Sequence, residues 1–543
     1  MAPNGYLALV LHAHLPYVRH PEYAEFLEED WLYEAIAETY LPLLDVLYRM
    51  VDDGVPFQIT MSLTPTLCHM LRDPVLQERT TRYLERSLAL AEAEAKRVSG
   101  QLRLERVVQF YRERIEQLLT AWEHRWKRDL VGAFAGLMDR GVLEIITCAA
   151  THGFLPLMEN FPEAVRAQIL IGRDHYRETF GRDPSGIWLP ECAYVPGLDS
   201  VLQEANLRWF IVDSHGLMFG NPRPRYAIYA PCFTPVGPAA FGRDRDSSRQ
   251  VWSSEQGYPG DPAYRDFYRD IGFDLSLDYL RPFLPGDGTR KFTGLKYHRI
   301  TGPGGDKDLY ERSWAIGAAD HHAWHFMTAR REQMQRLREN MNVDPVVVSP
   351  FDAELFGHWW FEGPEFLNFF IRKSVYDQQD YRLTTPTAYL EAHDTHQIVV
   401  PSASSWGHKG YWEVWLDDSN SWIYPHLHMA ARRMTEVTRL FKDRLHPADK
   451  VTAAAALSPA DAQLDRAIRQ MARELLLAQS SDWAFLMKTG TARNYAAKRS
   501  KDHILRFTRL YDQVRAEKID EPFLINCEWR DNLFPNLDWR YYA

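Results

Sequence analysis

Two carboxylates follow apolar runs and turns that contain proline, which is an unusual place for an acidic side chain. Glu191 follows the run 187–189 and a proline, and Asp352 follows the run 346–348 and a second proline turn. A buried charge is costly unless it is paired or used in chemistry. Two carboxylates across one pocket suit glycoside hydrolysis, in which one attacks the anomeric carbon or orients water and the other protonates the leaving oxygen. Structural ion pairing is the alternative for each acid, and Glu354 is a weaker candidate for the same role.

Histidines and tryptophans accompany these acids. His12 and His14 face the same side of an extended segment, because they are two residues apart. Together with His152 they could bind a metal, bond to sugar hydroxyls, or be ordinary polar residues at the mouth of a barrel. Flat indole rings in nearby segments suit stacking on pyranose rings, with core packing as the alternative. These residues are Trp252, Trp359, Trp360, Trp406 and Trp415.

The carboxylates belong to a recurring pattern of short apolar runs that each close on polar residues. The runs lie at 6–11, 57–61, 143–148, 187–189, 209–212, 346–348 and 398–400. Helical stretches such as 32–50 and 71–140 separate them, and this alternation predicts parallel βαβ units. About seven units predict an α/β fold with a closed or nearly closed barrel related to the (β/α)8 design. Active-site groups project from the C-terminal ends of strands in such barrels, so the polar residues are expected to meet there.

Two other parts of the chain depart from this rhythm. Residues 217–312 are rich in proline and glycine, which predicts long loops, and loops of this length in a compact domain are usually functional. The chain becomes helical after Trp406. We therefore expect a catalytic barrel over 1–404, with a loop-rich inserted region at about 195–312, and a helical domain over 405–543 that completes the cleft.

Composition limits the possible partners. The chain has 543 residues, a formal net charge of -10 and a pI near 6.1, which argues against nucleic acid as a partner. No apolar stretch is long enough to span a bilayer, and the N-terminus lacks the features of a secretion signal. The five cysteines are scattered, as expected for reduced thiols in a cytoplasmic protein.

Several motifs occur in the order of the signature regions of glycoside hydrolase family 57, and the chain resembles that family over nearly its whole length. The motifs are HAHLPY (12–17), SLTPTL (62–67), ATHG (150–153), WLPECAY (188–194), SPFDAELFGHWW (349–360), QVWSSEQGYPG (250–260), SWG (405–407) and SDWAFLM (481–487). Within the family, the chain is most similar to 1,4-α-glucan branching enzymes and their α-amylase-like relatives.

The resemblance implies a (β/α)7 barrel with a small inserted domain and a C-terminal helical domain. It implies retaining chemistry on α-1,4-glucan with no metal and no cofactor. Glu191 falls on the nucleophile and Asp352 on the general acid/base. The resemblance also assigns residues to the cleft and to substrate contacts, namely His12, His14, His152, Arg243, Trp252, Gly260, Trp406, Trp415 and Asp482.

Two departures from the branching pattern keep the reaction type open. The stretch 216–226 is shorter than the lid loop of branching members, with Tyr226 the nearest substitute for its tyrosine, and Thr491 stands where those members tend to have glutamine. A shorter lid favours hydrolysis, because closure keeps water from the intermediate. We expect a branching enzyme, with an α-amylase-like hydrolase as the alternative. A metal-dependent deacetylase and an inactive glycan-binding protein are more distant alternatives.

Overall fold

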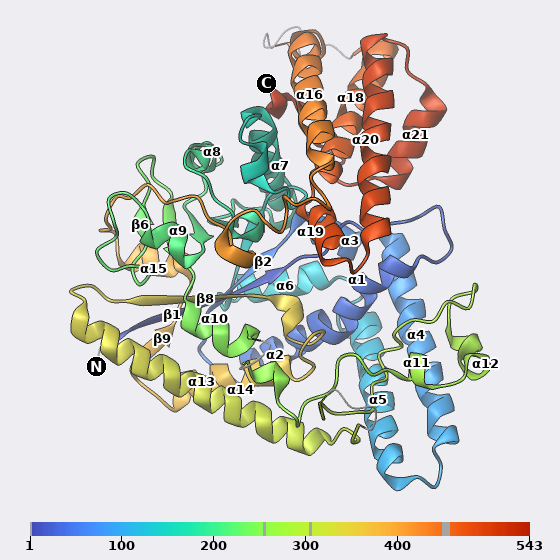
Figure 1. Cartoon of the computed structure of the whole chain (residues 1–543), viewed down its shortest axis with the longest axis vertical. Coiled ribbons are helices and arrows are strands. Elements are labelled where there is room, and N and C mark those ends of the chain that lie inside the picture. The colour runs from blue at the N-terminus through green and yellow to red at the C-terminus, as the bar shows by residue number, and fades with distance from the viewer. Residues whose placement is uncertain (1–2, 254–256, 303–306, 448–456) are drawn as a thin grey trace.

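Seven parallel strands form the centre of the molecule (Figure 1). The structure is a computed structural model that describes residues 3–253, 257–302, 307–447 and 457–543. The strand order is β7-β5-β4-β3-β2-β1-β8, with β6 antiparallel to β7 and β9 parallel to β1. The strands are β1 (Gly5–Ala13), β2 (Ile59–Leu63), β3 (Leu143–Cys148), β4 (Gly186–Trp188), β5 (Trp209–Val212), β6 (Cys232–Phe233), β7 (Ala239–Gly242), β8 (Val346–Asp352) and β9 (Tyr381–Leu383).

The two ends of this sheet meet, so the barrel closes. Arg243, directly after β7, forms a parallel bridge with Val348 of β8. The Asp244 backbone N–H donates to the Val348 carbonyl at 2.9 Å. Side chains of the parallel strands are almost all buried, as expected when helices cover the outside of a sheet. The predicted seven-stranded barrel is confirmed.

One of the seven predicted strands was wrong. Residues 398–400 form only isolated bridges, with Asn221 and Phe233, and are not a strand. The seventh strand is β7, which lies inside the stretch predicted as loop. Its sequence AAFG contains no β-branched residue, so its strand conformation comes from pairing with β5 and not from local preference.

The helices before residue 405 lie around the barrel and in the inserted region. They are α1 (Asp30–Ala35), α2 (Leu41–Asp52), α3 (Pro65–Arg72), α4 (Pro74–Arg97), α5 (Leu102–Thr120), α6 (Leu130–Asp139), α7 (Pro162–Phe180), α8 (Leu198–Glu204), α9 (Ser214–Met218), α10 (Arg245–Trp252), α11 (Ile271–Asp274), α12 (Leu277–Leu280), α13 (Arg312–Asn340), α14 (Gly363–Tyr376) and α15 (Pro386–Ala392). Helix α4 shows how the sequence sets a boundary. The Asp73 carboxylate accepts from the backbone N–H groups of Val75 and Leu76, and Pro74 occupies the first turn.

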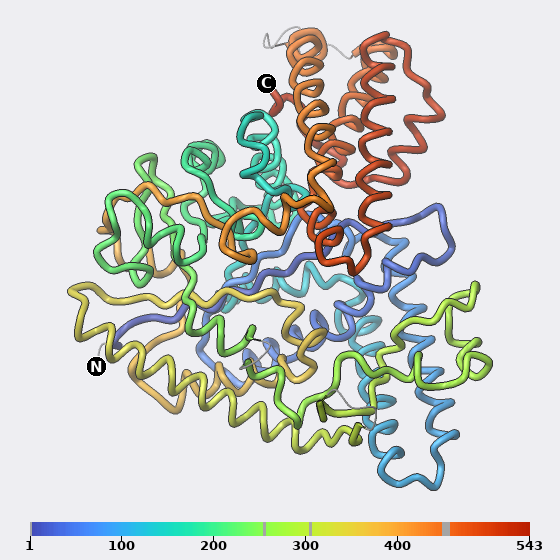
Figure 2. The backbone as a smooth tube through the Cα atoms, viewed as in Figure 1, coloured from blue at the N-terminus to red at the C-terminus, as the bar shows by residue number. Residues whose placement is uncertain are grey.

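The inserted region crosses the molecule from the β5 side of the barrel to the hairpin of α4 and α5, as the green part of the tube shows (Figure 2). Tyr279 and Tyr297 of this region donate to the Glu94 carboxylate of α4, at 2.8 and 3.0 Å. Tyr111 of α5 donates to the Lys296 carbonyl at 2.8 Å. These bonds fix a loop-rich segment on a rigid support.

The C-terminal helices stand together at the top of the molecule (Figure 1). They are α16 (Ile423–Leu445), α18 (Pro459–Ala478), α19 (Ser481–Thr489), α20 (Arg493–Arg515) and α21 (Glu521–Arg530). No helix in the described ranges is long and apolar enough to cross a membrane.

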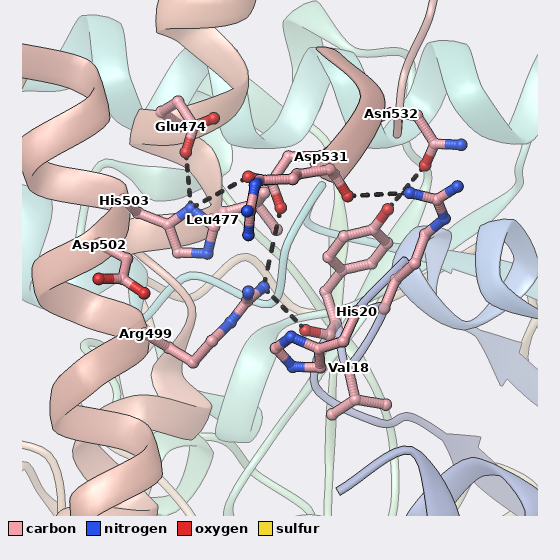
Figure 3. A network of polar contacts seen from close by, with 12 residues as sticks. Val18, His20, Glu474, Leu477, Arg499, Asp502, His503, Asp531 and Asn532 are labelled. Atoms are coloured by element: carbon pink, nitrogen blue, oxygen red, sulfur yellow. Dashed lines mark hydrogen bonds and ion pairs between the residues drawn. The ribbon is translucent and has the colours of Figure 1, made fainter. Parts of the chain in front are cut away.

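A buried polar network joins these helices to the segment after β1 (Figure 3). The His503 Nδ1 lies 2.7 Å from a Glu474 carboxylate oxygen and 3.8 Å from Asp531. Arg499 lies 3.8 Å from the same Asp531 and donates to the Tyr17 carbonyl at 3.2 Å. Breaking a buried ion pair by removing one partner is strongly destabilising, so the network fixes α18 and α20 against the barrel.

Candidate active site

Glu191 leaves the barrel on a strained turn. Its φ of 63° and the φ of 50° at Cys192 lie in the left-handed region, which non-glycine residues rarely adopt. Strain of this kind persists where the surrounding structure imposes it, and it is common at active sites. The turn directly follows β4, so it presents the carboxylate at the C-terminal edge of the barrel.

Two donors hold the Glu191 carboxylate. Trp406 Nε1 donates to Oε2 at 2.9 Å, and the Ser481 hydroxyl donates to Oε1 at 3.0 Å. Burial raises the pKa of Glu191, while these two hydrogen bonds act in the opposite direction because they favour the charged form. Ser481 opens α19, and its backbone N–H donates to the His152 carbonyl at 2.9 Å. The helical domain therefore supplies part of the site.

Asp352 is the last residue of β8 and is paired in register with His12 of β1. Burial, followed by the charges of Glu354 and Glu191, raises the pKa of Asp352 well above its ordinary value. Arg243 opposes this increase, and none of the described residues donates a hydrogen bond to the Asp352 carboxyl group. Such surroundings favour the protonated form of the acid.

Glu354 lies beside Asp352 but is held differently. Its Oε1 accepts from the Tyr40 hydroxyl at 2.5 Å and from the His14 backbone N–H at 3.1 Å. Burial raises the pKa of Glu354 to about 7, against the opposing effect of the Tyr40 bond. Through this one oxygen Glu354 holds the Tyr40 hydroxyl and the His14 backbone in place, which is a positioning role.

The three predicted histidines form a compact stack. The rings of His14 and His152 are 3.8 Å apart, and those of His12 and His152 are 5.2 Å apart. The His14 Nε2 lies 3.0 Å from Asp482, and although burial lowers the pKa of His14, the Asp482 carboxylate raises it above the usual value. Burial lowers the pKa of His12 and His152 well below that value. The last two are therefore neutral.

A directed chain of hydrogen bonds follows from this neutrality. Because Ser481 donates to Glu191, its hydroxyl must accept from His152 Nδ1, which lies 2.8 Å away. His152 Nε2 then accepts from His12 Nε2 at 3.1 Å, and His12 Nδ1 accepts from the Ser62 hydroxyl at 3.2 Å. Each hydrogen in this chain then has one donor and one acceptor. The chain runs from β2 to the Glu191 carboxylate.

His14, His152 and Asp482 also have the spacing of metal ligands, since one ligand atom of each lies within 4.8 Å of the others. A neutral imidazole and a carboxylate are suitable zinc donors. However, His152 Nδ1 and Nε2 already contact Ser481 and His12, and the His14 Nε2 contacts Asp482 directly. Each of the three side chains already has a protein hydrogen-bond partner, so the spacing alone does not indicate a metal centre.

The structure brings most of the predicted site residues together. Arg243 lies over the Trp406 ring, 5.3 Å from its centroid, and donates to Asp213 at 3.3 Å. Trp252 is the last residue of α10 with 38% of its surface exposed, and Gly260 is exposed on a separate turn, but no hydrogen bond joins either described residue to the two carboxylates. Residues 254–256 of the same motif lie outside the described residues.

Trp415 and Trp360 lie in the core, contrary to the expectation of open stacking surfaces. Each is 1% exposed. The Trp415 ring stacks on Phe154 at 4.4 Å and leaves no face for a sugar. Trp359, next in sequence to Trp360, is 53% exposed. The adjacent pair thus points in two directions.

The sequence interpretation missed Ser481, Ser62 and Asp213 as parts of the site. Ser481 lies beside the predicted Asp482 in the motif SDWAFLM, and Ser62 opens the motif SLTPTL. Asp213 follows β5, so the rule of polar residues at strand ends applies to it as well. The sequence does not show which distant residues come into contact. Nothing in it indicates that Ser481 reaches Glu191, which is 290 residues away.

Comparison with known proteins agrees with this geometry. Residues 8–401 match the model of glycosyl hydrolase family 57. The chain belongs to this family. Residues 426–542 match the model of the C-terminal region of 1,4-alpha-glucan branching enzymes. The family match supports the glycoside-hydrolysis interpretation of the two carboxylates over the deacetylase alternative.

The relatives carry two kinds of name. A 1,4-alpha-glucan branching enzyme of Thermococcus kodakarensis is 34% identical over 98% of this chain and 77% of its own. The crystal structure of a GH57-type branching enzyme from Pyrococcus horikoshii is 33% identical with a TM-score of 0.86, over 99% of this chain and 97% of that one. The crystal structure of an alpha-amylase from Thermotoga maritima is 43% identical with a TM-score of 0.90, over 99% of each chain.

Proposed function

We propose that this chain is a 1,4-α-glucan branching enzyme that retains anomeric configuration. It cleaves an α-1,4 linkage and transfers the released chain to a 6-hydroxyl group of an α-glucan. The observation that carries the proposal is the pair of carboxyl groups in contrasting environments at the ends of β4 and β8, within a family whose full-length relatives include branching enzymes.

Each carboxyl group has one role in the proposed mechanism. The ionised Glu191 attacks the anomeric carbon while the protonated Asp352 gives its proton to the leaving glycosidic oxygen. A covalent glycosyl-enzyme forms at Glu191 and the first product leaves with the transferred proton. Asp352, now ionised, takes the proton from the acceptor hydroxyl, whose oxygen attacks the anomeric carbon and releases Glu191. Two inversions give overall retention.

The surrounding residues support these roles. Trp406 and Ser481 orient the two oxygens of Glu191, which leaves the carboxylate in a fixed position for attack. His14, a member of the histidine stack, forms a polar pair with Asp482, and hydroxyl groups of a sugar ring would find donors and acceptors there. Arg243 lies against Trp406 and partly offsets the raised pKa of Asp352, so it would favour the ionised form needed in the second step.

An α-amylase-like hydrolase is the second candidate. The short stretch 216–226 and the 43% identity to a structure named as an alpha-amylase favour it. The match at 426–542 to the branching-enzyme C-terminal region favours the first candidate. Both candidates use the same carboxyl pair, so the acceptor, either a sugar hydroxyl or water, separates them.

Proton NMR of amylose incubated with the purified protein, together with a reducing-end assay, tests the proposal. Growth of the α-1,6 anomeric signal with few new reducing ends is the expected result. Reducing ends without α-1,6 signal would contradict branching and favour the amylase. If neither product forms but a separate binding measurement shows glucan affinity, the protein is an inactive glycan-binding protein. The Glu191→Gln variant, which lacks the proposed nucleophile, serves as the inactive control.

We also propose that 1–404 forms the catalytic barrel with its insertion and that 405–543 forms the helical domain. The family matches over 8–401 and 426–542 support this division. We propose a cytoplasmic location, which the five buried and free cysteines support. We propose an α-glucan as the binding partner.

A further inference from the structure

Five aromatic rings in contact with one another form a surface beside the active site. Trp359 stacks on Phe267, with 4.7 Å between centroids and 24° between planes. Tyr268 meets Phe267 edge-on at 5.1 Å, and Phe292 connects Phe267 to Phe273, at 6.0 and 5.4 Å. We call this group the aromatic shelf; its members are Phe267, Tyr268, Phe273, Phe292 and Trp359.

The shelf is open to solvent although its rings are apolar. Tyr268 is 77% exposed, Trp359 is 53% exposed and Phe273 is 52% exposed. Exposed aromatic rings that touch one another form a continuous patch, and such patches mark interaction sites more often than scattered single residues do. Phe267 packs against one face of the Trp359 ring, and the exposed half of Trp359 is the surface that a ligand could meet.

Contacts with Lys296 and His358 hold the shelf rigidly. The Lys296 ammonium group lies 4.2 Å from the Phe267 centroid and 4.4 Å from that of Phe292, and it donates to the Phe267 carbonyl at 2.6 Å. His358 lies edge-on to both Phe267 and Trp359 and is 2.8 Å from the Glu38 carboxylate. Rings fixed in this way lose little entropy on binding.

One residue connects the shelf to the active site. The Glu354 carbonyl accepts from the backbone N–H groups of His358 and Trp359, each at 3.2 Å. The Glu354 side chain accepts from the His14 backbone N–H at 3.1 Å. Gly357 makes the turn between them with a φ of 132°, and a Cβ there would lie 2.0 Å from the Glu38 carbonyl oxygen. The shelf is thus a continuation of the segment that carries Asp352.

The charges around the shelf are compensated. Arg269 lies 3.0 Å from Asp274, Lys307 pairs with Asp266, and Arg265 lies 2.8 Å from Glu38. A surface with flat rings and paired charges suits a neutral ligand that offers apolar ring faces. The C–H faces of linked pyranose units have this chemistry.

We infer that the aromatic shelf binds glucose units of an α-glucan chain outside the catalytic positions, so that long chains are held beside the site. This inference rests on the proposed function for the identity of the chain. The shelf adds contacts that a long chain can reach and a short one cannot. It therefore acts on affinity for long glucans and not on the chemical step.

The test measures glucan binding to the full-length Glu191→Gln protein, in which turnover is blocked, by calorimetry with amylose and with maltotriose. Adding Trp359→Ala should weaken amylose binding about tenfold, as the loss of one ring stack implies, and leave maltotriose binding unchanged. Trp359→Phe should restore most of the affinity. Trp314→Ala provides the matched control, because this indole is 58% exposed on α13, outside the shelf.

Three outcomes would overturn the inference: unchanged amylose binding in Trp359→Ala, an equal loss for both ligands, or a change in sedimentation showing that the shelf joins two copies of the chain. The wild-type NMR assay separates the two proposals. If the wild type converts no glucan but the shelf variant still loses amylose affinity, only the proposed function fails. If the wild type branches amylose and the variant binds normally, only the shelf fails.

Discussion

The Glu191 and Asp352 ends of the site hold a carboxyl group by different means. Glu191 lies on a left-handed turn, with donors from Trp406 and Ser481 on its two oxygens. Asp352 ends an extended strand, with no hydrogen-bond donor to its carboxyl group among the described residues and with other carboxylates nearby. One environment offsets the cost of a buried charge, and the other increases it.

The contrast suggests how two acids in one cleft divide their roles. Burial raises the pKa of both groups, but only Glu191 has hydrogen bonds that favour its ionised form. Environments that separate the pKa values of two neighbouring acids also separate the base or nucleophile from the acid. Since the two interact, the titration belongs to the pair and not to either residue alone.

Replacing the nucleophile should have the largest effect. Glu191→Gln keeps the shape and accepts hydrogen bonds, but an amide does not attack the anomeric carbon. We expect kcat on amylose to fall about 10⁴-fold or more, with glucan binding retained. Glu354→Gln is the matched control, because it changes a second buried carboxylate that already accepts two hydrogen bonds, and its loss should be far smaller. Near wild-type turnover in Glu191→Gln would show that Glu191 is structural.

The sequence predicted six of the seven barrel strands and the polar residues at their C-terminal ends, although β1, β2 and β8 extend beyond the predicted runs. Both carboxylates and all three histidines were found because their chemistry and their position after apolar runs are local signals. Strand β7 was missed, since AAFG has no strand preference of its own and depends on β5. Trp415 was misplaced for a similar reason: the side of an indole that meets Phe154 is decided by tertiary packing.

The contacts between distant segments were beyond any local pattern. Ser481 reaches Glu191 from the helical domain, which a network around Asp531 and Arg499 helps to fix against the barrel. The aromatic shelf likewise joins Trp359 to a loop about 90 residues earlier in the sequence, which no periodicity predicts. The sequence identified the two reactive carboxyl groups. It could not identify the residues from distant segments that position them.

Removing the acid should have the second-largest effect and should depend on the substrate. We expect Asp352→Asn to lower kcat about 10²–10⁴-fold on amylose, because its glycosidic oxygen needs a proton to leave. Substrates with leaving groups that need no protonation, such as α-maltosyl fluoride, should recover much of the first step. An equal loss on both kinds of substrate would contradict the role of Asp352 as the acid.

The pH dependence of activity tests the same contrast between a protonated Asp352 and an ionised Glu191. Asp352 acts in its protonated form, so wild-type activity is lost as pH rises through its raised pKa, and Glu191 acts in its ionised form, so activity is lost as pH falls through its own. In Asp352→Asn, the alkaline limb of kcat/KM should flatten for α-maltosyl fluoride while the acid limb remains. An alkaline limb unchanged in the variant would assign it to another group.

Removing one donor from Glu191 should have the smallest effect and should make its environment more like that of Asp352. Ser481→Ala deletes the hydroxyl bonded to Oε1 and ends the chain from His152. We expect kcat/KM to fall roughly 10- to 100-fold, the value of a hydrogen bond to a charged group. The acid limb should move to higher pH, because the lost bond had lowered the pKa of Glu191. Ser500→Ala, which removes a buried hydroxyl bonded to the Ala496 carbonyl at 3.0 Å, controls for stability. A rate loss with no movement of the acid limb would mean that Ser481 positions α19 without tuning the nucleophile.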